Sequence, residues 1–225
     1  MYKKIAVHPG TRAVYAQRLI EQHGFTEAEL DEVKKEFFED LTASPKLASF
    51  CLTEPGAGSD VSGMRTRAVK KGDKYVINGS KCFITNGGYA DWFTVYAKTD
   101  MDAGHRGISA FLVKKDDTVI VDKKEDKMGQ RASNTATVTF NDTEIDAKYL
   151  LGEENKGFKV AMQTLDFTRP GVAAMAVGIA RAAFEFACDY SKERVQFGVP
   201  IAMHQAIQFM IADMATKVHL SRLAT

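Results

Sequence analysis

One short stretch of the chain combines residue types that can bind a cofactor through the main chain. Residues 51–61 read CLTEPGAGSDV, so polar side chains, a proline and two glycines follow an apolar lead-in. Gly56 and Gly58 allow a tight turn and the close approach of another molecule. Successive amides in such a turn can form a concave site for an anion or a carbonyl-rich ring, and Thr53 and Ser59 add hydrogen-bonding side chains. The same composition is also typical of a plain polar turn.

Length and composition indicate an ordinary globular chain. The 225 residues are 45% hydrophobic and 26% charged, which suits one large domain or two small ones. A net charge of +1 gives no sign of nucleic-acid or membrane-surface binding. No apolar run approaches the ~20 residues of a membrane-spanning helix, and residues 1–8 lack the apolar segment of a secretory signal. We therefore expect a cytoplasmic protein, or a mitochondrial-matrix protein in a eukaryote.

Motifs for metals and for nucleotide phosphates are missing from the sequence. Cys51, Cys82 and Cys188 lack metal-ligand spacing, and their odd number favours a reducing compartment. We expect all three to be small buried filler. The glycine stretch lacks the third glycine and the following helix of a dinucleotide fingerprint, which excludes a Rossmann site.

The elements that carry this stretch begin with two short helices. Thr11 predicts the start of a helix that ends near His23. Thr26 and Glu29 have capping-box spacing, which predicts a second helix that ends near Leu41. We predict that residues 1–45 form a helical hairpin appendage and a linker.

Residues 46–156 are predicted to form a β-rich domain. Apolar residues recur with period two in short runs separated by turn residues, which is typical of an antiparallel barrel or sandwich. Asn78-Gly79 predicts a tight hairpin turn, and Asn141-Asp142 is predicted to end the last strand. The predicted strands are 65–69, 75–77, 81–85, 91–99, 107–113, 119–121 and 135–140.

Residues 157–225 are predicted to form helices. Pro170 permits a kink or a new start, and residues 172–190 are rich in alanine and other small residues. Gly198 and Pro200 predict a turn before a last helix. Two such helices cannot bury both of their faces, so we expect a partial bundle that needs further chain or a second copy. The end at Ala224-Thr225, without a cap, predicts a truncated chain. The expected fold class is α+β, with an antiparallel β-barrel middle domain flanked by helices and an incomplete C-terminal bundle.

Over residues 46–225 the chain resembles the acyl-CoA dehydrogenase family, and the medium-chain type most of all. The motifs that carry the resemblance occur in family order. They are CLTEPGAGSD (51–60), INGSK (77–81), FITNGG (83–88), MGQR (128–131), GFKVAM (157–162), DFTR (166–169), ER (193–194), FG (197–198) and HQ (204–205). Residues 1–41 separately resemble a short piece of the thiamine-dependent component of 2-oxoglutarate dehydrogenase, without a thiamine-binding motif.

The resemblance implies an FAD site between the barrel and the bundle. Phe83 stands where most relatives have Trp, and Gln196 where medium-chain enzymes often have Thr. Arg194 and Gln205 would contact the FAD of a neighbouring subunit. The implied FAD contacts are Phe50, Cys51, Leu52, Thr53, Gly58, Ser59, Phe83, Ile84, Thr85, Arg194, Gln196, Phe197, His204 and Gln205. The implied acyl-CoA contacts are Ser59, Phe158, Asp166 and Arg169.

The resemblance also implies a reaction, although no catalytic base is found. Relatives remove the α-proton of an acyl-CoA with a carboxylate and pass the β-hydrogen to FAD as hydride. They form homo-oligomers and give electrons to the electron-transferring flavoprotein. In some relatives a Glu stands just before the arginine of the 166–169 motif, where this chain has Thr168. Glu54 is the only carboxylate in residues 51–59, and the family assigns it no proton abstraction. We therefore expect weak activity or none.

Simpler interpretations of these residues remain open. Arg194 could be a cation at a helix end, Asp166 and Arg169 a surface pair, and Thr85 an ordinary strand residue. Three hypotheses follow for the chain: an incomplete acyl-CoA dehydrogenase, a non-catalytic remnant that binds flavin or acyl-CoA, and a fusion or structural product without a ligand.

Overall fold

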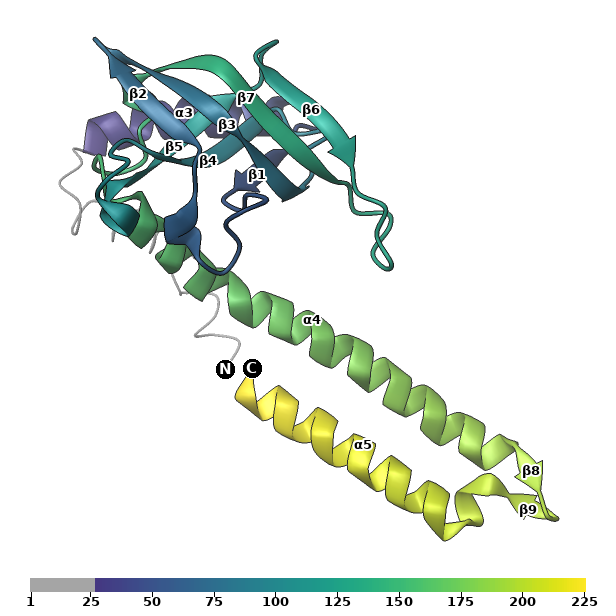
Figure 1. Cartoon of the computed structure of the whole chain (residues 1–225). Helices are drawn as coiled ribbons and strands as arrows, with labels where there is room; N and C mark the ends of the chain where they lie inside the picture. The colour runs from purple at the N-terminus through teal and green to yellow at the C-terminus, as the bar shows by residue number, and fades with distance from the viewer. Residues whose placement is uncertain (1–26) are drawn as a thin grey trace. The chain divides into compact units, whose positions relative to one another are not determined.

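A computed structural model describes residues 27–225 of the chain (Figure 1). The contacts divide it into two compact units, Met1–Ala161 and Met162–Thr225, which we call unit 1 and unit 2. The boundary falls inside helix α4 (Gly157–Glu193). The helix predicted from Thr11 to His23 and its capping residue lie outside the described residues.

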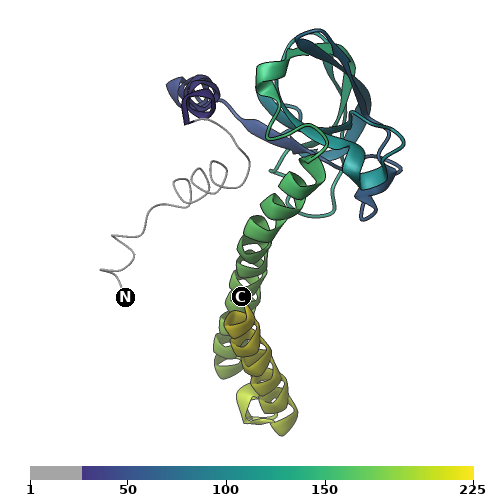
Figure 2. The same ribbon diagram turned by 90° about the vertical axis from the view of Figure 1, so that its left-hand side faces the viewer.

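Unit 1 is built on a mixed seven-stranded sheet. Figure 2 shows this sheet curled round nearly into a ring. The path of paired strands is β1-β4-β2-β3-β7-β6, with β5 also paired to β4. The strands are β1 (Ala48–Cys51), β2 (Arg67–Lys71), β3 (Lys74–Thr85), β4 (Trp92–Lys98), β5 (Ile108–Lys114), β6 (Val119–Lys124) and β7 (Thr135–Asp146). The α+β prediction is confirmed. The antiparallel barrel is not, because β1 and β2 each pair with β4 in parallel.

The hairpin predicted at Asn78-Gly79 is wrong, because β3 runs through both residues as one strand. β3 pairs with β7 along its length, with a shift of register between Ile77 and Gly79. At this point Asn78 exchanges two hydrogen bonds of 2.9 Å with the side chain and the amide of Asp142. The prediction that the last strand ends at Asn141-Asp142 is wrong for the same reason. The two turn-like dipeptides face each other in an irregularity that bends the paired strands.

Gly79 is needed for a close approach of two chain segments. A Cβ at this position would lie 2.4 Å from Thr66 Oγ1 and 2.7 Å from Thr66 Cα, and the φ angle is +150°. Any larger residue would therefore push residue 66 away from β3. The glycine of the Asn78-Gly79 dipeptide is therefore required by close packing against Thr66 and not by a reversal of the chain.

The core of unit 1 lies on the inner side of the curl. Strand alternation sends one set of side chains inward, and aromatic rings from four strands, β3, β4, β5 and β7, meet there. Tyr75 lies 5.0 Å from Phe111, and Phe93 lies 6.1 Å from Phe140, measured between ring centroids. All four are at most 1% exposed. Burying each such side chain is worth about 1.5–3 kcal/mol, so this cluster supplies a large share of the unit's stability.

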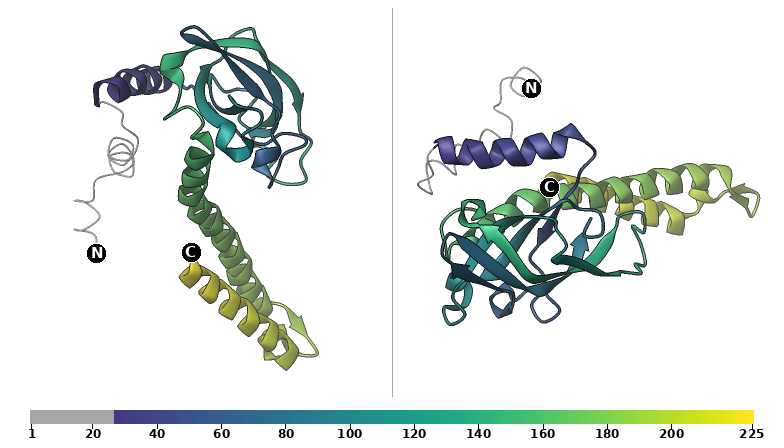
Figure 3. Two further views of the ribbon diagram at one scale, coloured as in Figure 1. Left: turned by 60° about the vertical axis from the view of Figure 1, so that its left-hand side comes forward. Right: turned by 90° about the horizontal axis from the view of Figure 1, so that it is seen from above.

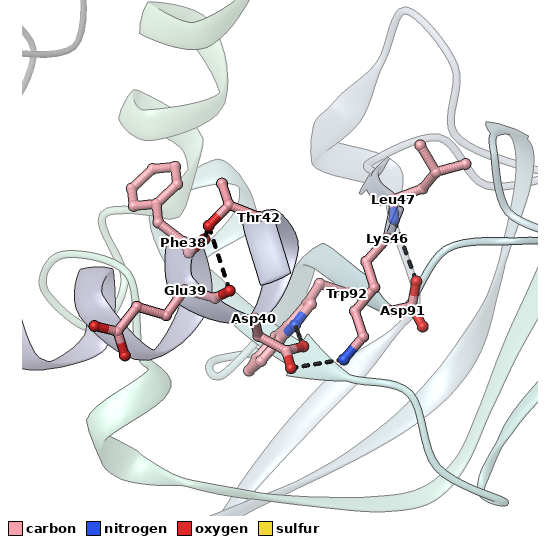
Figure 4. A network of polar contacts seen from close by, with 8 residues as sticks. All are labelled: Phe38, Glu39, Asp40, Thr42, Lys46, Leu47, Asp91 and Trp92. Carbon is pink, nitrogen blue, oxygen red and sulfur yellow. Dashed lines mark hydrogen bonds and ion pairs between the residues drawn. The ribbon is translucent and has the colours of Figure 1, made fainter. Parts of the chain in front are cut away.

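Within unit 1, helix α3 (Glu27–Ala43) makes specific contacts with the sheet and the segment that follows it (Figure 4). Asp40 accepts hydrogen bonds from Trp92 Nε1 at 2.8 Å and from Lys46 Nζ at 2.6 Å. The Phe37 ring meets the Trp92 ring edge-on at 5.5 Å. Glu36 accepts a hydrogen bond from the Tyr149 hydroxyl at 2.5 Å. The second predicted helix is confirmed, and its last two turns are fixed to the sheet.

Unit 2 is a pair of helices joined by a small hairpin, and the helices lie side by side (Figures 1 and 3). α4 leads to β8 (Val195–Gln196) and β9 (Val199–Pro200), and a 3₁₀ turn (Ile201–Met203) precedes α5 (Gln205–Ala224). The predicted turn and last helix are confirmed. Pro170 lies within α4 and does not end it. Because proline has no N–H, the carbonyl of Asp166 lacks its usual helical donor.

The most apolar 18 residues of α4 have a mean hydropathy of 1.5, and none of them is buried. Length and composition alone would let such a helix cross a membrane. The same properties are found in helices that pack in the core of a soluble bundle.

Candidate functional site

Two of the predicted cofactor-binding segments, residues 50–59 and 83–85, are brought together in unit 1. Three hydrogen bonds join residues 49–53 to residues 81–85. Ser49 Oγ donates to the Thr85 carbonyl at 2.8 Å, and the Cys82 amide donates to the Thr53 carbonyl at 3.0 Å. Lys81 Nζ donates to the Leu52 carbonyl at 3.1 Å. The two segments are about thirty residues apart in sequence and form one continuous wall.

A buried ion pair supports this wall. Lys81 Nζ lies 2.8 Å from Glu54 Oε1, and the two side chains are 0% and 6% exposed. The same oxygen accepts the Thr66 amide at 3.0 Å, and Oε2 accepts the Arg65 amide at 2.6 Å. Glu54 also exchanges two main-chain hydrogen bonds with Ala57, at 3.0 and 3.1 Å, which close the turn that contains Gly56.

The electrostatics of the pair keep Glu54 charged. Burial raises the pKa of its carboxyl, but the Lys81 ammonium and the amides that donate to it outweigh burial and hold the pKa below its ordinary value. Burial lowers the pKa of Lys81, and Glu54 opposes that shift. With all its polar contacts made inside the protein, Glu54 is a structural carboxylate, in keeping with the expectation that it is no catalytic base.

The glycine loop is open toward solvent. A Cβ built on Gly56 or Gly58 would meet no atom within 4 Å, and neither residue has a positive φ angle. The tight turn expected here therefore does not itself require a glycine at either position. Gly58 and Ser59 are exposed. Bare main chain facing open space leaves room for another molecule to approach closely.

The predicted contact residues of unit 1 differ in what they present. Phe83 is 65% exposed and has a φ angle of +58°, which is rare for an aromatic residue. It sits where the register of β3 and β7 shifts, between Lys81 and Ile84. Thr85 is exposed, and Phe50 and Thr53 are partly exposed. The side chains of Cys51, Leu52 and Ile84 are buried at 0%, 7% and 2% exposure, so only their main-chain atoms could meet a ligand.

Phe158 lies in the first turn of α4, within unit 1. Its ring is 5.2 Å from the His105 ring, and it is partly exposed. At the start of the helix, Gly157 packs directly on β5. A Cβ on Gly157 would lie 2.4 Å from the Ser109 carbonyl carbon.

In unit 2, five predicted FAD contacts cluster at the β8–β9 hairpin. Phe197 and Gly198 form its two-residue turn with φ angles of +55° and +79°, which leaves the Phe197 side chain 94% exposed. The Phe197 ring meets the His204 ring edge-on at 5.8 Å. The other three residues are Arg194, Gln196 and Gln205, all exposed.

The predicted acyl-CoA contacts of unit 2 lie far from that hairpin. Arg169 donates to Asp166 Oδ1 at 2.8 Å, and both side chains are more than 60% exposed, as in an ordinary surface pair. The Thr168 hydroxyl donates to the Leu165 carbonyl at 3.3 Å. α4 separates Asp166 from Glu193 by roughly 40 Å, at its rise of ~1.5 Å per residue. Residues at both ends of α4 therefore cannot contact one flavin within one chain.

The cysteine and metal expectations can be checked within residues 27–225. Cys51 and Cys82 are buried, as predicted, whereas Cys188 is partly exposed. All three are free thiols, and burial raises the pKa of the Cys51 thiol. The described part of the chain has no group of three His, Cys, Asp or Glu residues that could hold a metal ion.

Comparison with known proteins identifies the family. Residues 49–143 match the model "Acyl-CoA dehydrogenase, middle domain", and residues 155–225 match "Acyl-CoA dehydrogenase, C-terminal domain". The chain is 48% identical over 200 residues to the probable medium-chain specific acyl-CoA dehydrogenase 2, mitochondrial, of Caenorhabditis briggsae, covering 87% of this chain and 49% of that protein. The chain belongs to the acyl-CoA dehydrogenase family, of which it carries middle and C-terminal domain sequence.

Solved structures agree with this assignment. Butyryl-CoA dehydrogenase from Megasphaera elsdenii is 48% identical, with a TM-score of 0.82 over 92% of this chain and 53% of that one. A chain from a study of the electron transferring flavoprotein of Acidaminococcus fermentans is 47% identical, also with a TM-score of 0.82, over the same shares. The chain spans about half the length of the curated relatives it matches.

The sequence similarity to the C. briggsae protein begins before residue 46. Residues 46–225 make up 180 of the 225 residues, which is about 80% of the chain, whereas the C. briggsae match covers 87%. At least part of residues 27–45 therefore lies within the region of likeness, in agreement with the contacts of α3.

Sequence reasoning missed the residues that support the site. It assigned no role to Lys81, although a lysine between apolar strand residues is a weak signal of a buried charge. It treated Glu54 only as a rejected base. Ser49, 5% exposed, and the amides of Arg65 and Thr66 carry no sequence signal, because their roles come from main-chain geometry.

Proposed function

We propose that this chain forms part of an FAD-dependent dehydrogenase that acts on an acyl-CoA thioester. The observation that carries the proposal is the wall made by residues 50–59 and 83–85. It combines open glycine main chain, exposed hydroxyls and an exposed aromatic ring, and a buried ion pair supports it from behind. Membership of the acyl-CoA dehydrogenase family supports the choice of cofactor and substrate.

The residues of the wall fit a flavin. A flavin ring is planar, with carbonyl and nitrogen atoms along one edge. The Phe83 ring, 65% exposed, offers a flat apolar surface for such a ring to pack against. Thr53 and Thr85 offer hydroxyls, and the bare main chain at Gly58 leaves room for a close approach.

Bound FAD would supply the hydride acceptor, while this chain's residues bind and orient the reactants. Thr53, Phe83 and Thr85 would hold the cofactor. Ser59 would face the acyl-CoA, and the cationic fork of Arg169 suits a phosphate or a polar carbonyl. Arg169 would have to exchange its present partner, Asp166, for that ligand.

Removal of the α-proton needs a base within hydrogen-bond reach. Thr168, at the position where some relatives have a Glu, is a poor base at neutral pH and donates to its own helix. Glu54 already accepts three hydrogen bonds. This favours a second candidate function, binding of FAD and acyl-CoA without turnover by the residues present.

The proposed partners follow from the two ends of α4. The cluster at Arg194 and Phe197 is roughly 40 Å along α4 from Asp166, so we propose that it meets the FAD of another copy in a homo-oligomer. We also propose that other helices, and not a membrane, cover the exposed apolar stretch of α4. The reason is that this stretch lies in the region that matches the acyl-CoA dehydrogenase C-terminal domain. The proposed electron acceptor is an electron-transferring flavoprotein.

The proposed location is the cytoplasm, or the mitochondrial matrix in a eukaryote. The name of the C. briggsae relative includes the word mitochondrial, which supports the second alternative.

The test is to purify the full chain with added FAD and record its visible absorbance. Retained flavin after gel filtration would support both candidate functions, and its absence at saturating FAD would contradict both. Bleaching of the flavin band by acyl-CoAs of different chain lengths, without oxygen, would favour turnover and reveal a base. Spectral shifts without bleaching would favour binding alone. The Thr168→Glu variant then tests whether a carboxylate at that position restores bleaching.

A further inference from the structure

Lys81 and Glu54 form an unusual contact in this molecule. Among the ion pairs that join described residues, theirs is the one in which both side chains are nearly inaccessible, at 0% and 6% exposure. By contrast, the pair of Lys74 and Glu144 has side chains 47% and 58% exposed.

Stability alone is a weak reason for a buried pair. Taking two charges out of water costs free energy that their attraction often only offsets, and apolar side chains of similar volume often stabilise a core equally well. An apolar pair could not, however, satisfy main-chain polar groups. Lys81 donates to the Leu52 carbonyl, and Glu54 accepts the amides of Arg65 and Thr66.

These contacts converge on the main chain of the wall. Lys81 Nζ donates to Leu52 and to Glu54, which are the two neighbours of Thr53 in the chain. The amide of the next residue, Cys82, donates to the carbonyl of Thr53 itself. Phe83 follows directly on the same strand with its left-handed backbone. The position of one ammonium group therefore sets the spacing of residues 52–54 from residue 83.

We propose that Lys81, acting through Glu54, is a positioning residue that fixes the geometry of the flavin-facing wall. It touches neither cofactor nor substrate, because its side chain is fully buried. The proposal rests on the proposed function for its link to the flavin. Its structural part, the fixing of residues 52–54 and of the amides of Arg65 and Thr66, stands on the contacts alone.

The experiment compares Lys81→Met with a control of matched stability. Methionine keeps an unbranched chain of similar size but loses the charge and all three donors. Ile145→Ala removes buried volume where β7 pairs with Tyr75, six residues along β3 from Lys81 and away from the wall. We expect the FAD dissociation constant of the full chain to rise at least about tenfold in Lys81→Met, which corresponds to ~1.4 kcal/mol. We expect it to change less than about twofold in Ile145→Ala at equal thermal stability.

A second variant covers the case in which Lys81→Met does not fold. Glu54→Gln keeps the size of the side chain but replaces one acceptor oxygen with a donor. Either Arg65 loses its acceptor, or Lys81 and Thr66, which share Oε1, both lose theirs. We expect weaker FAD binding and a shifted flavin absorption band. Equal weakening in Ile145→Ala and in the Lys81 or Glu54 variants, matched for stability, would overturn the proposal.

Hydrogen exchange separates the proposal from the proposed function. We expect the amides of Arg65, Thr66 and Cys82 to lose protection in the Lys81 or Glu54 variant and to keep it in Ile145→Ala. If the wild-type chain binds no FAD, the proposed function and the link to the flavin both fail, while this measurement still decides whether Lys81 fixes the wall. Unchanged protection would overturn the structural part even in a chain that binds FAD.

Discussion

Units 1 and 2 both contain many apolar residues, but they bury them very differently. In unit 1 the core cluster includes Phe93, Phe111 and Phe140, which are each at most 1% exposed. In unit 2, where all of Met162–Thr225 is described, Ser191 is the one buried residue. Large apolar side chains remain exposed there, including Val172, Met175, Ile179, Phe186, Tyr190, Phe209, Met210, Leu220 and Leu223.

The difference follows from geometry. A sheet that curls encloses the side chains of its inner face, so seven short strands supply both sides of a core. The two antiparallel helices of unit 2 enclose no such space and leave most of their surfaces uncovered. Unit 1 therefore has a hydrophobic core of its own within the described residues. The helices of unit 2 instead expose apolar faces that further helices could cover.

The ion pairs of the two units differ in burial in the same way as the apolar side chains. Lys81 and Glu54 are buried in unit 1, while Arg169 and Asp166, also 2.8 Å apart, are 64% and 69% exposed in unit 2. Distance alone does not decide what an ion pair does. Burial decides whether its loss leaves a charge without a partner or simply returns it to water.

The largest expected effect tests the burial of apolar groups. Phe111→Ala should lower the free energy of unfolding of unit 1 by about 3–5 kcal/mol, because it leaves a cavity in the core. Phe186→Ala, at a side chain 74% exposed, should change stability by less than about 0.5 kcal/mol. Urea unfolding followed by far-UV circular dichroism measures both. A large loss in Phe186→Ala would mean that another surface covers α4 in solution.

The second effect tests the ion pairs. Lys81→Met should lower the free energy of unfolding by about 3–5 kcal/mol, since Glu54 would remain buried without its cation. Arg169→Met should cost about 0–1 kcal/mol, since Asp166 is exposed to water. The same urea titration compares the two variants. Similar small losses in both would contradict the burial of the Lys81 pair.

A third measurement asks whether α3 covers Trp92 on the sheet of unit 1. Trp92 is the only tryptophan of the chain and is 0% exposed. Asp40→Ala removes the acceptor of its indole N–H, so the fluorescence emission of Trp92 should move to longer wavelength as α3 loosens. Glu39→Ala, an exposed neighbour on α3, is the control and should leave the spectrum unchanged. An unchanged spectrum in Asp40→Ala would mean that α3 does not shield Trp92.

The smallest expected effect is a dependence on pH. The folded state holds the pKa of Glu54 below its ordinary value of 4.5, so the stability that its charge contributes is present above that value and is lost as pH falls through the folded pKa. Between pH 5 and about pH 3 the wild-type chain should therefore lose more unfolding free energy than Glu54→Gln. Urea midpoints at several pH values measure the difference. Parallel pH profiles for the two proteins would contradict it.

Much of the fold could be predicted because its signals are local. Period-two alternation of apolar residues predicted a β-rich domain, and a run rich in alanine and other small residues marked the region of α4. The residues 51–61 suggested a cofactor loop, since glycine, proline and hydroxyl residues together are rare outside turns and binding sites. The order of the family motifs then predicted which residues of both units contact FAD and acyl-CoA.

Other features depend on partners far away in sequence. Asn78-Gly79 has the local signature of a hairpin turn, yet hydrogen bonds with Asp142 on β7 let β3 continue through it as one strand with a bend. The mixed sheet has the same origin, because β1 reaches β4 across forty residues of chain.

The sequence by itself therefore determined the β-rich and helical regions, the family, and the loop at Gly56 and Gly58, because each follows from local residue patterns and from the order of short motifs. Only the tertiary structure decided that those glycines face open space and that Glu54 is held by Lys81 behind them. The physical reason is that burial and pairing are properties of groups 27 residues apart, and no local pattern encodes them.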